Sequence, residues 1–182
     1  MQDFVHLHVH THYSLLDGQA SVSRLVDKAM KDGMKGIAIT DHGNMFGIKE
    51  FINYVSKKNK GLAPEERFKP IVGCEMYVAR RGKDKREGKQ DLGGWHLIVL
   101  AKNEKGYHNL IKLVSRAWTE GYYMHPRTDR QDLEKYHEGL IVCSACIAGE
   151  VPRKILQGKL NEAEEAIQWY KQVFGSDFYL EL

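Results

Sequence analysis

Histidines crowd the start of the chain at a spacing that suits metal binding. Four of the nine histidines, His6, His8, His10 and His12, fall close together. Imidazole nitrogens are common ligands of zinc, manganese and iron. In an extended strand, side chains at i and i+2 point to the same face, so His8 and His10 could bind one ion. By itself the pair fits a ligand pair and an ordinary polar strand face equally well.

The two flanking histidines suit other roles. His6 lies deeper on the same predicted face, where a hydrogen-bonded core histidine is the favoured interpretation. His12 follows the predicted strand and is expected at the surface.

Further candidate ligands follow or interrupt apolar segments. Asp17 comes after the first predicted strand, although Asp-Gly alone is more typical of a turn. The run Asp41-His42-Gly43-Asn44 directly follows the second strand, and His42 is its candidate ligand. Glu75 and His96 lie in apolar surroundings, where an unpaired charge is costly and needs a partner or a metal.

Cys143 and Cys146 form a Cys-x-x-Cys pair at the end of a predicted strand. Half of a zinc site or a redox pair is one interpretation, but the sequence has no second Cys-x-x-Cys to complete it. We favour Cys143 packed inside the strand and Cys146 as a thiolate ligand at the mouth of the site. Three cysteines, an odd number, fit a reducing cytosol better than a disulfide framework.

Strands and helices are expected to alternate and to position these residues. Apolar periodicity predicts strands over residues 4–10, 36–40, 69–78, 96–101, 140–143 and 178–182, and helices over residues 21–31, 45–58, 107–118, 149–157 and 161–174. Residues 80–94 lack an apolar period and predict a mobile loop. The alternation indicates an α/β fold with a mainly parallel sheet. Polar residues at the strand ends favour a barrel over a doubly wound sheet.

Size and composition describe an ordinary soluble domain. The 182 residues are enough for one domain, which we place over residues 1–182. A net charge of +3 is too weak to indicate nucleic-acid binding by itself. No apolar run approaches the ~20 residues of a membrane span, and the first residues do not resemble a secretory signal. A cytoplasmic protein is therefore expected.

Several motifs, in order along the chain, resemble the PHP (polymerase and histidinol phosphatase) family. They are most similar to the PHP domain that opens the bacterial replicative DNA polymerase III alpha subunit. The motifs are HLHVHT at 6–11, YSLLDG at 13–18, TDHGN at 40–44, PIVGCE at 70–75, GYHNL at 106–110, PRTD at 126–129 and SAC at 144–146.

The resemblance implies a distorted seven-stranded (β/α)7 barrel whose mouth holds two or three transition-metal ions (zinc, manganese or iron). It implies the ligands His8, His10, Asp17, His42, Glu75, His96 and Cys146. The family completes its set with an Asp-x-His motif, which is not found before Leu182. We therefore expect an incomplete PHP domain, the N-terminal fragment of a larger replicative polymerase.

The activity implied by the resemblance is metal-assisted phosphodiester hydrolysis by a 3′–5′ exonuclease used in proofreading, with polymerase activity in downstream domains. Arg127 is the candidate for holding the phosphate. The basic residues 80–89 could touch DNA, although a solvated loop fits them better. The expected partners are DNA, downstream polymerase domains and other replisome subunits.

Two alternatives stay open: a histidinol-phosphatase-like enzyme for small molecules, and a non-catalytic metal-binding scaffold. The motifs at 15–18 and 106–110 favour the polymerase branch over the phosphatase branch.

Overall fold

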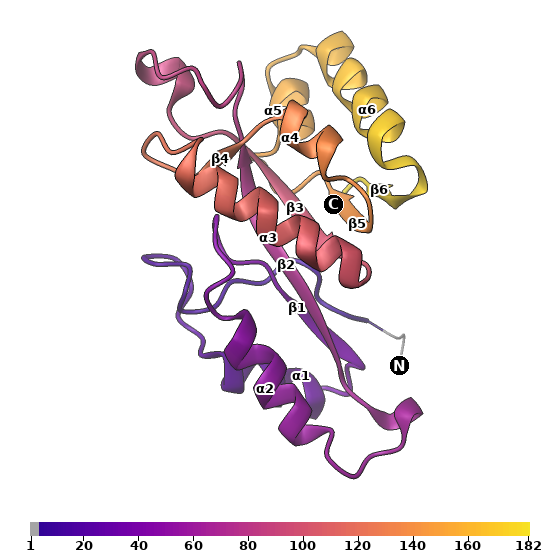
Figure 1. Cartoon of the computed structure of the whole chain (residues 1–182). Coiled ribbons are helices and arrows are strands. Elements are labelled where there is room, and N and C mark those ends of the chain that lie inside the picture. Colours follow the sequence, from indigo (N-terminus) through magenta and orange to yellow (C-terminus); the bar gives the residue numbers. More distant parts are fainter. Residues whose placement is uncertain (1–3) are drawn as a thin grey trace.

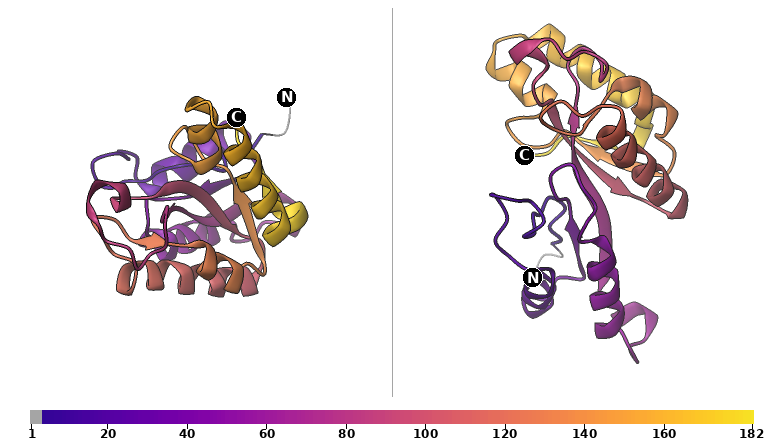
Figure 2. Two further views of the ribbon diagram at one scale, coloured as in Figure 1. Left: turned by 90° about the horizontal axis from the view of Figure 1, so that it is seen from above. Right: turned by 60° about the vertical axis from the view of Figure 1, so that its left-hand side comes forward.

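One long strand, β2 (Lys69–Val78), connects the two halves of the molecule (Figure 1). Its first four residues pair in parallel with β1 (Gly36–Ile39). From Gly73 onward it pairs antiparallel with β3 (Trp95–Ala101), and its last two residues also pair with β4 (Arg127–Thr128). Figure 2 shows the N-terminal half at one end of this strand and the C-terminal half at the other.

The computed structural model describes residues 4–182. The remaining elements are α1 (Val22–Lys31), α2 (Ile48–Lys58), α3 (Glu104–Thr119), α4 (Arg130–Lys135), β5 (Leu140–Cys143), α5 (Glu150–Leu156), α6 (Leu160–Phe174) and β6 (Phe178–Tyr179), with short 3-10 turns at Pro64–Glu66, Gly88–Asp91 and Gly175–Asp177. In the described part of the chain, no helix is long and apolar enough to cross a bilayer.

The sheet is mixed, which corrects the prediction of a mainly parallel sheet. Its strand order is β1-β2-β3-β5-β6, with β4 beside β2. The β2–β3 and β3–β5 pairs are antiparallel. A parallel pair needs a crossover, usually through a helix, but β2 returns directly into β3 through the irregular residues 79–94.

Barrel closure is not seen in the described residues. The strand pairing ends at β1 on one side and at β6 on the other. A hollow of 690 Å³ lies between residues 4–8 and residues 179–182. The α/β fold is confirmed at this coarser level, and the seven-stranded barrel stays a prediction.

The predicted strand over residues 4–10 is wrong in detail. The segment runs beside β1 and makes two backbone hydrogen bonds, from Ala38 N to His6 O and from Thr40 N to Val9 O (both 2.9 Å). A bend at residues 7–8 breaks the alternation, so no regular strand forms. The prediction of His6 as a core residue is also wrong, because its side chain is exposed, whereas His12 is exposed as expected.

Most other elements match the prediction to within a few residues, and two shifts have local causes. The helix expected from residue 45 begins at Ile48, because the Asn44 side chain accepts a hydrogen bond from Phe46 N (3.1 Å) and holds a turn. The helix expected from residue 107 begins at Glu104, because the Asn103 side chain caps it through Gly106 N. The last predicted strand is reduced to Phe178–Tyr179.

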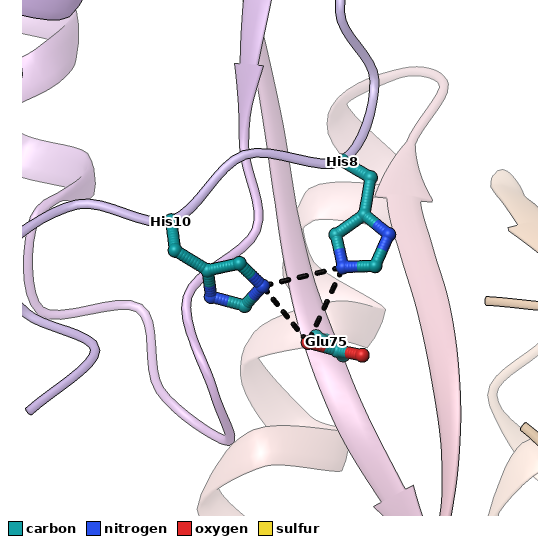
Figure 3. Close-up of side chains that lie close together, drawn as sticks. All are labelled: His8, His10 and Glu75. Carbon is teal, nitrogen blue, oxygen red and sulfur yellow. Dashed lines mark hydrogen bonds and ion pairs between the residues drawn. The ribbon is translucent and has the colours of Figure 1, made fainter. Parts of the chain in front are cut away.

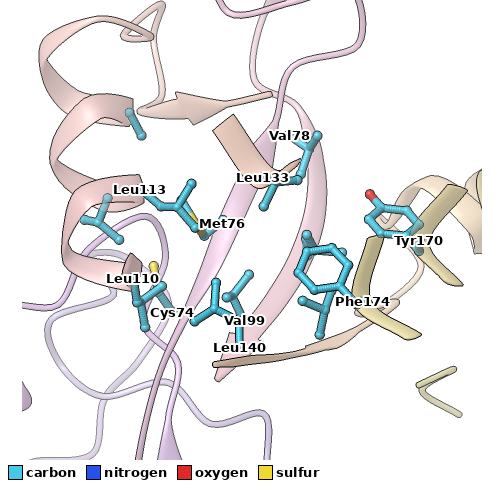
Figure 4. Close-up of a cluster of buried hydrophobic side chains, with 14 residues drawn as sticks. Cys74, Met76, Val78, Val99, Leu110, Leu113, Leu133, Leu140, Tyr170 and Phe174 are labelled. Atoms are coloured by element: carbon cyan, nitrogen blue, oxygen red, sulfur yellow. The ribbon is translucent and has the colours of Figure 1, made fainter. Parts of the chain in front are cut away.

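Two main apolar clusters stabilise the two halves. In the C-terminal half, α3, α4 and α6 pack on β2, β3 and β5, as Figure 4 shows for Leu110, Leu113 and Tyr170. In the N-terminal half, α1 and α2 cover β1 through residues such as Val26 and Phe51. Burying one such large apolar side chain contributes about 1.5–3 kcal/mol. These two clusters hold the sheet in place, and the sheet in turn positions the polar side chains on its strands.

Ion pairs anchor the segment expected to be a mobile loop, residues 80–94. Arg81 forms a bidentate pair with the buried Asp91 (2.6 and 3.0 Å). Lys83 pairs with Asp132 and with Glu120. Since charged contacts replace apolar ones here, the segment is ordered without any apolar period.

Candidate metal centre

Glu75 is the centre of the polar cluster. It lies on β2 just beyond the part that pairs with β1, and its side chain is 1% exposed. The backbone fixes its position, because Glu75 N donates to Asp41 O (3.2 Å) and Glu75 O accepts from Gly43 N (2.8 Å). Imidazoles from four separate positions of the chain surround its carboxylate.

His8 and His10 approach Glu75 from the N-terminal segment, which crosses over β2 in Figure 3. The distances to Glu75 Oε2 are 3.3 Å from His8 Nε2 and 2.9 Å from His10 Nε2. The two Nε2 atoms are 3.2 Å apart. The expectation that this i, i+2 pair points to one place is confirmed, although the segment is not a regular strand.

Asp17 and His42 extend the cluster toward solvent. His42 Nε2 is 3.0 Å from Asp17 Oδ2, and His42 Nδ1 is 3.0 Å from Glu75 Oε2. His10 Nδ1 lies 4.0 Å from the same Asp17 oxygen. With 57% of its side chain exposed, Asp17 is the most open of these groups.

His96 and Cys146 complete the cluster on the side of β3. His96 Nδ1 is 2.7 Å from Glu75 Oε1. Cys146 Sγ lies 3.8 Å from Glu75 Oε1 and 3.7 Å from His96 Nδ1. Cys146 is exposed, whereas Cys143 is buried in β5, so the two cysteines occupy the separate places expected of them.

The side chains form three overlapping groups that could each hold one metal ion. The groups are His8-His10-Glu75, His10-Asp17-His42 and His42-Glu75-His96. Cys146 adds a sulfur beside the third group. Nitrogen, oxygen and sulfur ligands of this kind suit zinc, manganese and iron.

Two buried atoms support a metal at this place. His42 Nδ1 and Glu75 Oε2 are buried and lie 3.0 Å apart, but in the described residues neither atom takes part in a well-formed hydrogen bond. Buried polar atoms are rarely left unpaired, because the loss of hydration costs about 1–3 kcal/mol for each. Both atoms belong to ligand groups, so an ion coordinated there would satisfy them.

Proton affinities in the cluster reflect the shared carboxylate. Burial lowers the pKa of His8, but hydrogen bonds to Glu181 and Glu75 outweigh it and raise the pKa to about 9. Burial raises the pKa of Glu75, but close contacts with the surrounding histidines, His10 first, hold it far below its usual range. The close contact with the Glu75 carboxylate raises the pKa of His42. Metal binding must displace such protons, so affinity should fall in acid.

A buried carboxylate that we had not assigned, Asp41, orders the loop that carries the ligands. Asp41 Oδ1 accepts from Thr11 N and from Ser14 Oγ (both 2.7 Å), and Oδ2 accepts from Thr11 Oγ1 (2.8 Å). Ser14 Oγ also lies 2.8 Å from His10 Nδ1. Asp41 therefore positions His10 from behind, as outer partners of metal ligands commonly do. In the sequence, the position of Asp41 next to His42 was the feature that could have indicated this role.

Sequence reasoning also missed Glu181 and Tyr77. Glu181 Oε1 is 2.7 Å from His8 Nδ1 and orients that ring, and no local pattern marks it. The Tyr77 ring packs against His42 and His96, with centroids 6.0 and 5.1 Å away. Tyr77 lies two residues after Glu75 on the same strand, so strand periodicity could have predicted that both side chains point to the same face.

Arg127 does not lie at the mouth, which corrects its expected role as the phosphate-binding residue. Its side chain is fully buried. The guanidinium donates to three backbone carbonyls, Gly121 O (2.9 Å), Asp91 O (2.8 Å) and Lys83 O (2.9 Å). These bonds occupy the guanidinium, so Arg127 ties two loops together instead of facing a substrate.

Comparisons with known proteins agree with this geometry. The family model for the PHP domain matches residues 6–182. DNA polymerase III subunit alpha of Borreliella burgdorferi is 52% identical over 181 residues, which is 98% of this chain and 15% of that protein. The Treponema pallidum protein of the same description is 48% identical over 177 residues, 97% of this chain and 14% of that protein. The chain thus spans about 15% of the length of the curated relatives it matches.

Two solved structures share the fold. A Bifidobacterium adolescentis protein assigned as a metal-dependent phosphoesterase has a TM-score of 0.51 at 12% identity, over 98% of this chain and 88% of that one. An amidohydrolase from Chromobacterium violaceum has a TM-score of 0.50 at 13% identity, over 97% and 87%. At such identities the likeness concerns the fold alone. With a family match over nearly its whole length and a histidine–carboxylate cluster at the expected ligand positions, the chain belongs to the PHP domain family.

Proposed function

We propose that this chain is the PHP domain of a replicative DNA polymerase III alpha subunit, and that its metal centre hydrolyses phosphodiester bonds as a 3′–5′ exonuclease. The main support for this proposal is the overlap of the three ligand groups, in which His10, His42 and Glu75 each belong to two groups. A carboxylate can bridge two ions, so Glu75, which belongs to two of the groups, would bring neighbouring ions close together, as in two-metal sites that act on phosphate esters.

The residues of the cluster would have different roles in such a site. When bound, divalent metals lower the pKa of a water molecule and neutralise charge on a phosphate. Glu75, buried and shared, holds the inner ligand groups together. Asp17 leaves the cluster open toward solvent, which is where a substrate would enter. Tyr77 and the buried Asp41 support the ligand histidines from behind.

The proposed activity also implies a cellular location, a substrate and partners. Proofreading would place the domain in the cytoplasm with DNA as substrate, beside downstream polymerase domains and other replisome subunits. The support is the identity to the alpha subunits, 52% for the Borreliella burgdorferi protein.

The test is nucleotide release from a 5′-labelled single-stranded oligonucleotide by the purified chain loaded with manganese or zinc. We expect stepwise shortening from the 3′ end, abolished in Glu75→Gln. Glu150→Gln is the matched control, because Glu150 is also buried but its carboxylate pairs with Arg130 and Lys154 and belongs to none of the three ligand groups. It should remain active.

The alternatives predict different results in the same assay. Hydrolysis of histidinol phosphate with no action on DNA would favour the small-molecule phosphatase. Metal binding without hydrolysis of either substrate, also in a full-length polymerase that contains the chain, would favour the scaffold.

A further inference from the structure

Three exposed rings form a surface that the metal centre does not use, here called the aromatic shelf: Phe46, Trp118 and Tyr122. Their exposed fractions are 65%, 42% and 48%. The Trp118 ring lies 5.6 Å from Tyr122 with an angle of 21° between the planes, and 6.2 Å from Phe46 with an angle of 36°. A hollow of 390 Å³ is lined by Phe46, Trp118 and neighbouring residues of α3.

The aromatic shelf is joined to the metal centre by Gly43. The Trp118 indole N–H donates to Gly43 O (2.8 Å), which fixes the ring. Gly43 directly follows the candidate ligand His42, and its N–H donates to Glu75 O (2.8 Å). A molecule on the shelf would therefore lie beside whatever occupies the cluster.

Charges around the aromatic shelf favour an anionic partner. Glu120, between Trp118 and Tyr122 in sequence, is already paired with Lys83 and Arg116. The Arg86 guanidinium donates to the backbone Glu120 O (2.7 Å), which places its charge beside the shelf. Lys49 is exposed three residues after Phe46, and in residues 4–182 neither Arg86 nor Lys49 has an ion-pair partner.

We infer that the aromatic shelf stacks the bases of a single-stranded nucleic acid whose phosphates reach the metal centre. The inference rests on the proposed function, since it names the substrate class of the same site. Bases stack on exposed aromatic rings regardless of sequence, and cations nearby follow the backbone. A single strand is required because base pairing and stacking in a duplex hide the base faces. A protein partner is less well matched, because two cations without ion-pair partners accompany the rings.

The experiment separates base stacking from phosphate attraction. A fluorescent thymidine 12-mer and an abasic oligonucleotide of equal length are titrated by anisotropy with the chain in EDTA, so that no hydrolysis is needed. We expect the thymidine strand to bind at least ~10-fold more tightly, since stacking on one ring contributes about 5- to 150-fold in affinity. Phe46→Ala and Tyr122→Ala should each lower that preference about 5-fold or more and leave abasic binding unchanged.

Tyr179→Ala is the matched control. Its ring is 53% exposed, comparable to that of Tyr122, but it lies on β6 and lines the hollow beside residues 4–8, not the hollow beside Phe46 and Trp118. The control should keep the full preference for thymidine. Melting temperatures verify that each variant is folded.

Equal binding of the two oligonucleotides, or a preference that survives both shelf substitutions, would overturn the inference. So would a dimer that Phe46→Ala dissolves while DNA binding shows no base dependence, because a second copy would then be the occupant. Binding of the thymidine strand without hydrolysis in manganese would overturn only the proposed function. Hydrolysis of bis(p-nitrophenyl) phosphate without base-dependent binding would overturn only the shelf.

Discussion

The overlap of the three ligand groups makes metal loss depend on which ligand is removed. His8, Asp17 and His96 each belong to one group, whereas His10, His42 and Glu75 each belong to two. A substitution of an unshared ligand should therefore empty one position, and a substitution of a shared ligand should empty two. We take His8→Ala and Glu75→Gln as the test pair.

The size of the effect follows from ordinary ligand energetics. Losing even an outer partner of a metal ligand lowers affinity about 10–100-fold, and a lost direct ligand costs at least as much. If free metal is kept about 10-fold above the dissociation constant, a 100-fold loss lowers occupancy from about 90% to about 10%. We expect about three equivalents in the natural chain, about two in His8→Ala and about one in Glu75→Gln.

Elemental analysis after equilibrium dialysis against manganese or zinc measures these values. Glu150→Gln changes a buried glutamate that belongs to none of the three ligand groups, so it should keep the full metal content. Far-ultraviolet circular dichroism must show that Glu75→Gln is folded before its metal content is compared. Equal losses in His8→Ala and Glu75→Gln would refute the assignment of Glu75 as a shared ligand. Unchanged metal content in both would refute the centre itself.

Three further outcomes are expected. Arg127→Met should lower the free energy of unfolding by about 3–5 kcal/mol in urea titrations, because three buried carbonyls lose their donor, without any loss of metal. The second outcome concerns Asp132. Burial raises the pKa of its carboxyl group, but hydrogen bonds from Lys83 and Arg116 outweigh burial and hold this pKa below its usual value of about 3.9. Its stabilising contribution should be complete above that value and lost as the pH falls through the folded pKa, so the stability gap to Asp132→Asn should be full at neutral pH and narrow in acid. Leu16→Asn should increase the free energy of unfolding by about 0.5–1 kcal/mol and thus raise the melting temperature, because exposed Leu16 has φ 67° and asparagine tolerates that conformation better. An unchanged or lower melting temperature would contradict that argument.

The candidate ligands were predictable because their chemical types conflict with their surroundings. Glu75 and His96 lie in apolar strands where a charge needs a partner, and the structure brings them to 2.7 Å from one another. β2 was predicted with its observed bounds, Lys69–Val78, since its apolar residues leave no other interpretation. The alternation of residues 4–10 was equally regular, but a bend at residues 7–8 broke the strand and still delivered His8 and His10 to one place.

The rest depends on contacts between residues far apart in the sequence. Arg127 was expected to hold a substrate phosphate, but its burial is decided by the carbonyls of Lys83, Asp91 and Gly121. The antiparallel return from β2 to β3 was hidden for a similar reason. Residues 79–94 carry no apolar period, because ion pairs such as Arg81–Asp91 hold them instead. Neither feature leaves a periodic trace that a local pattern could show.

Backbone strain gives a further indication of where the site lies. In residues 4–182 the non-glycine residues with positive φ are Leu16, Met124 and Ala145. Two of them directly precede candidate ligands, Asp17 and Cys146. A left-handed conformation costs such residues about 1–2 kcal/mol and persists only where the surroundings fix it. Near Leu16, a Cβ on Gly18 would lie 1.9 Å from Thr11 O, so the loop can only take this tight course with glycine there. The fold thus accepts strain next to two of the candidate ligands, and no property of leucine or alanine in the sequence reveals it.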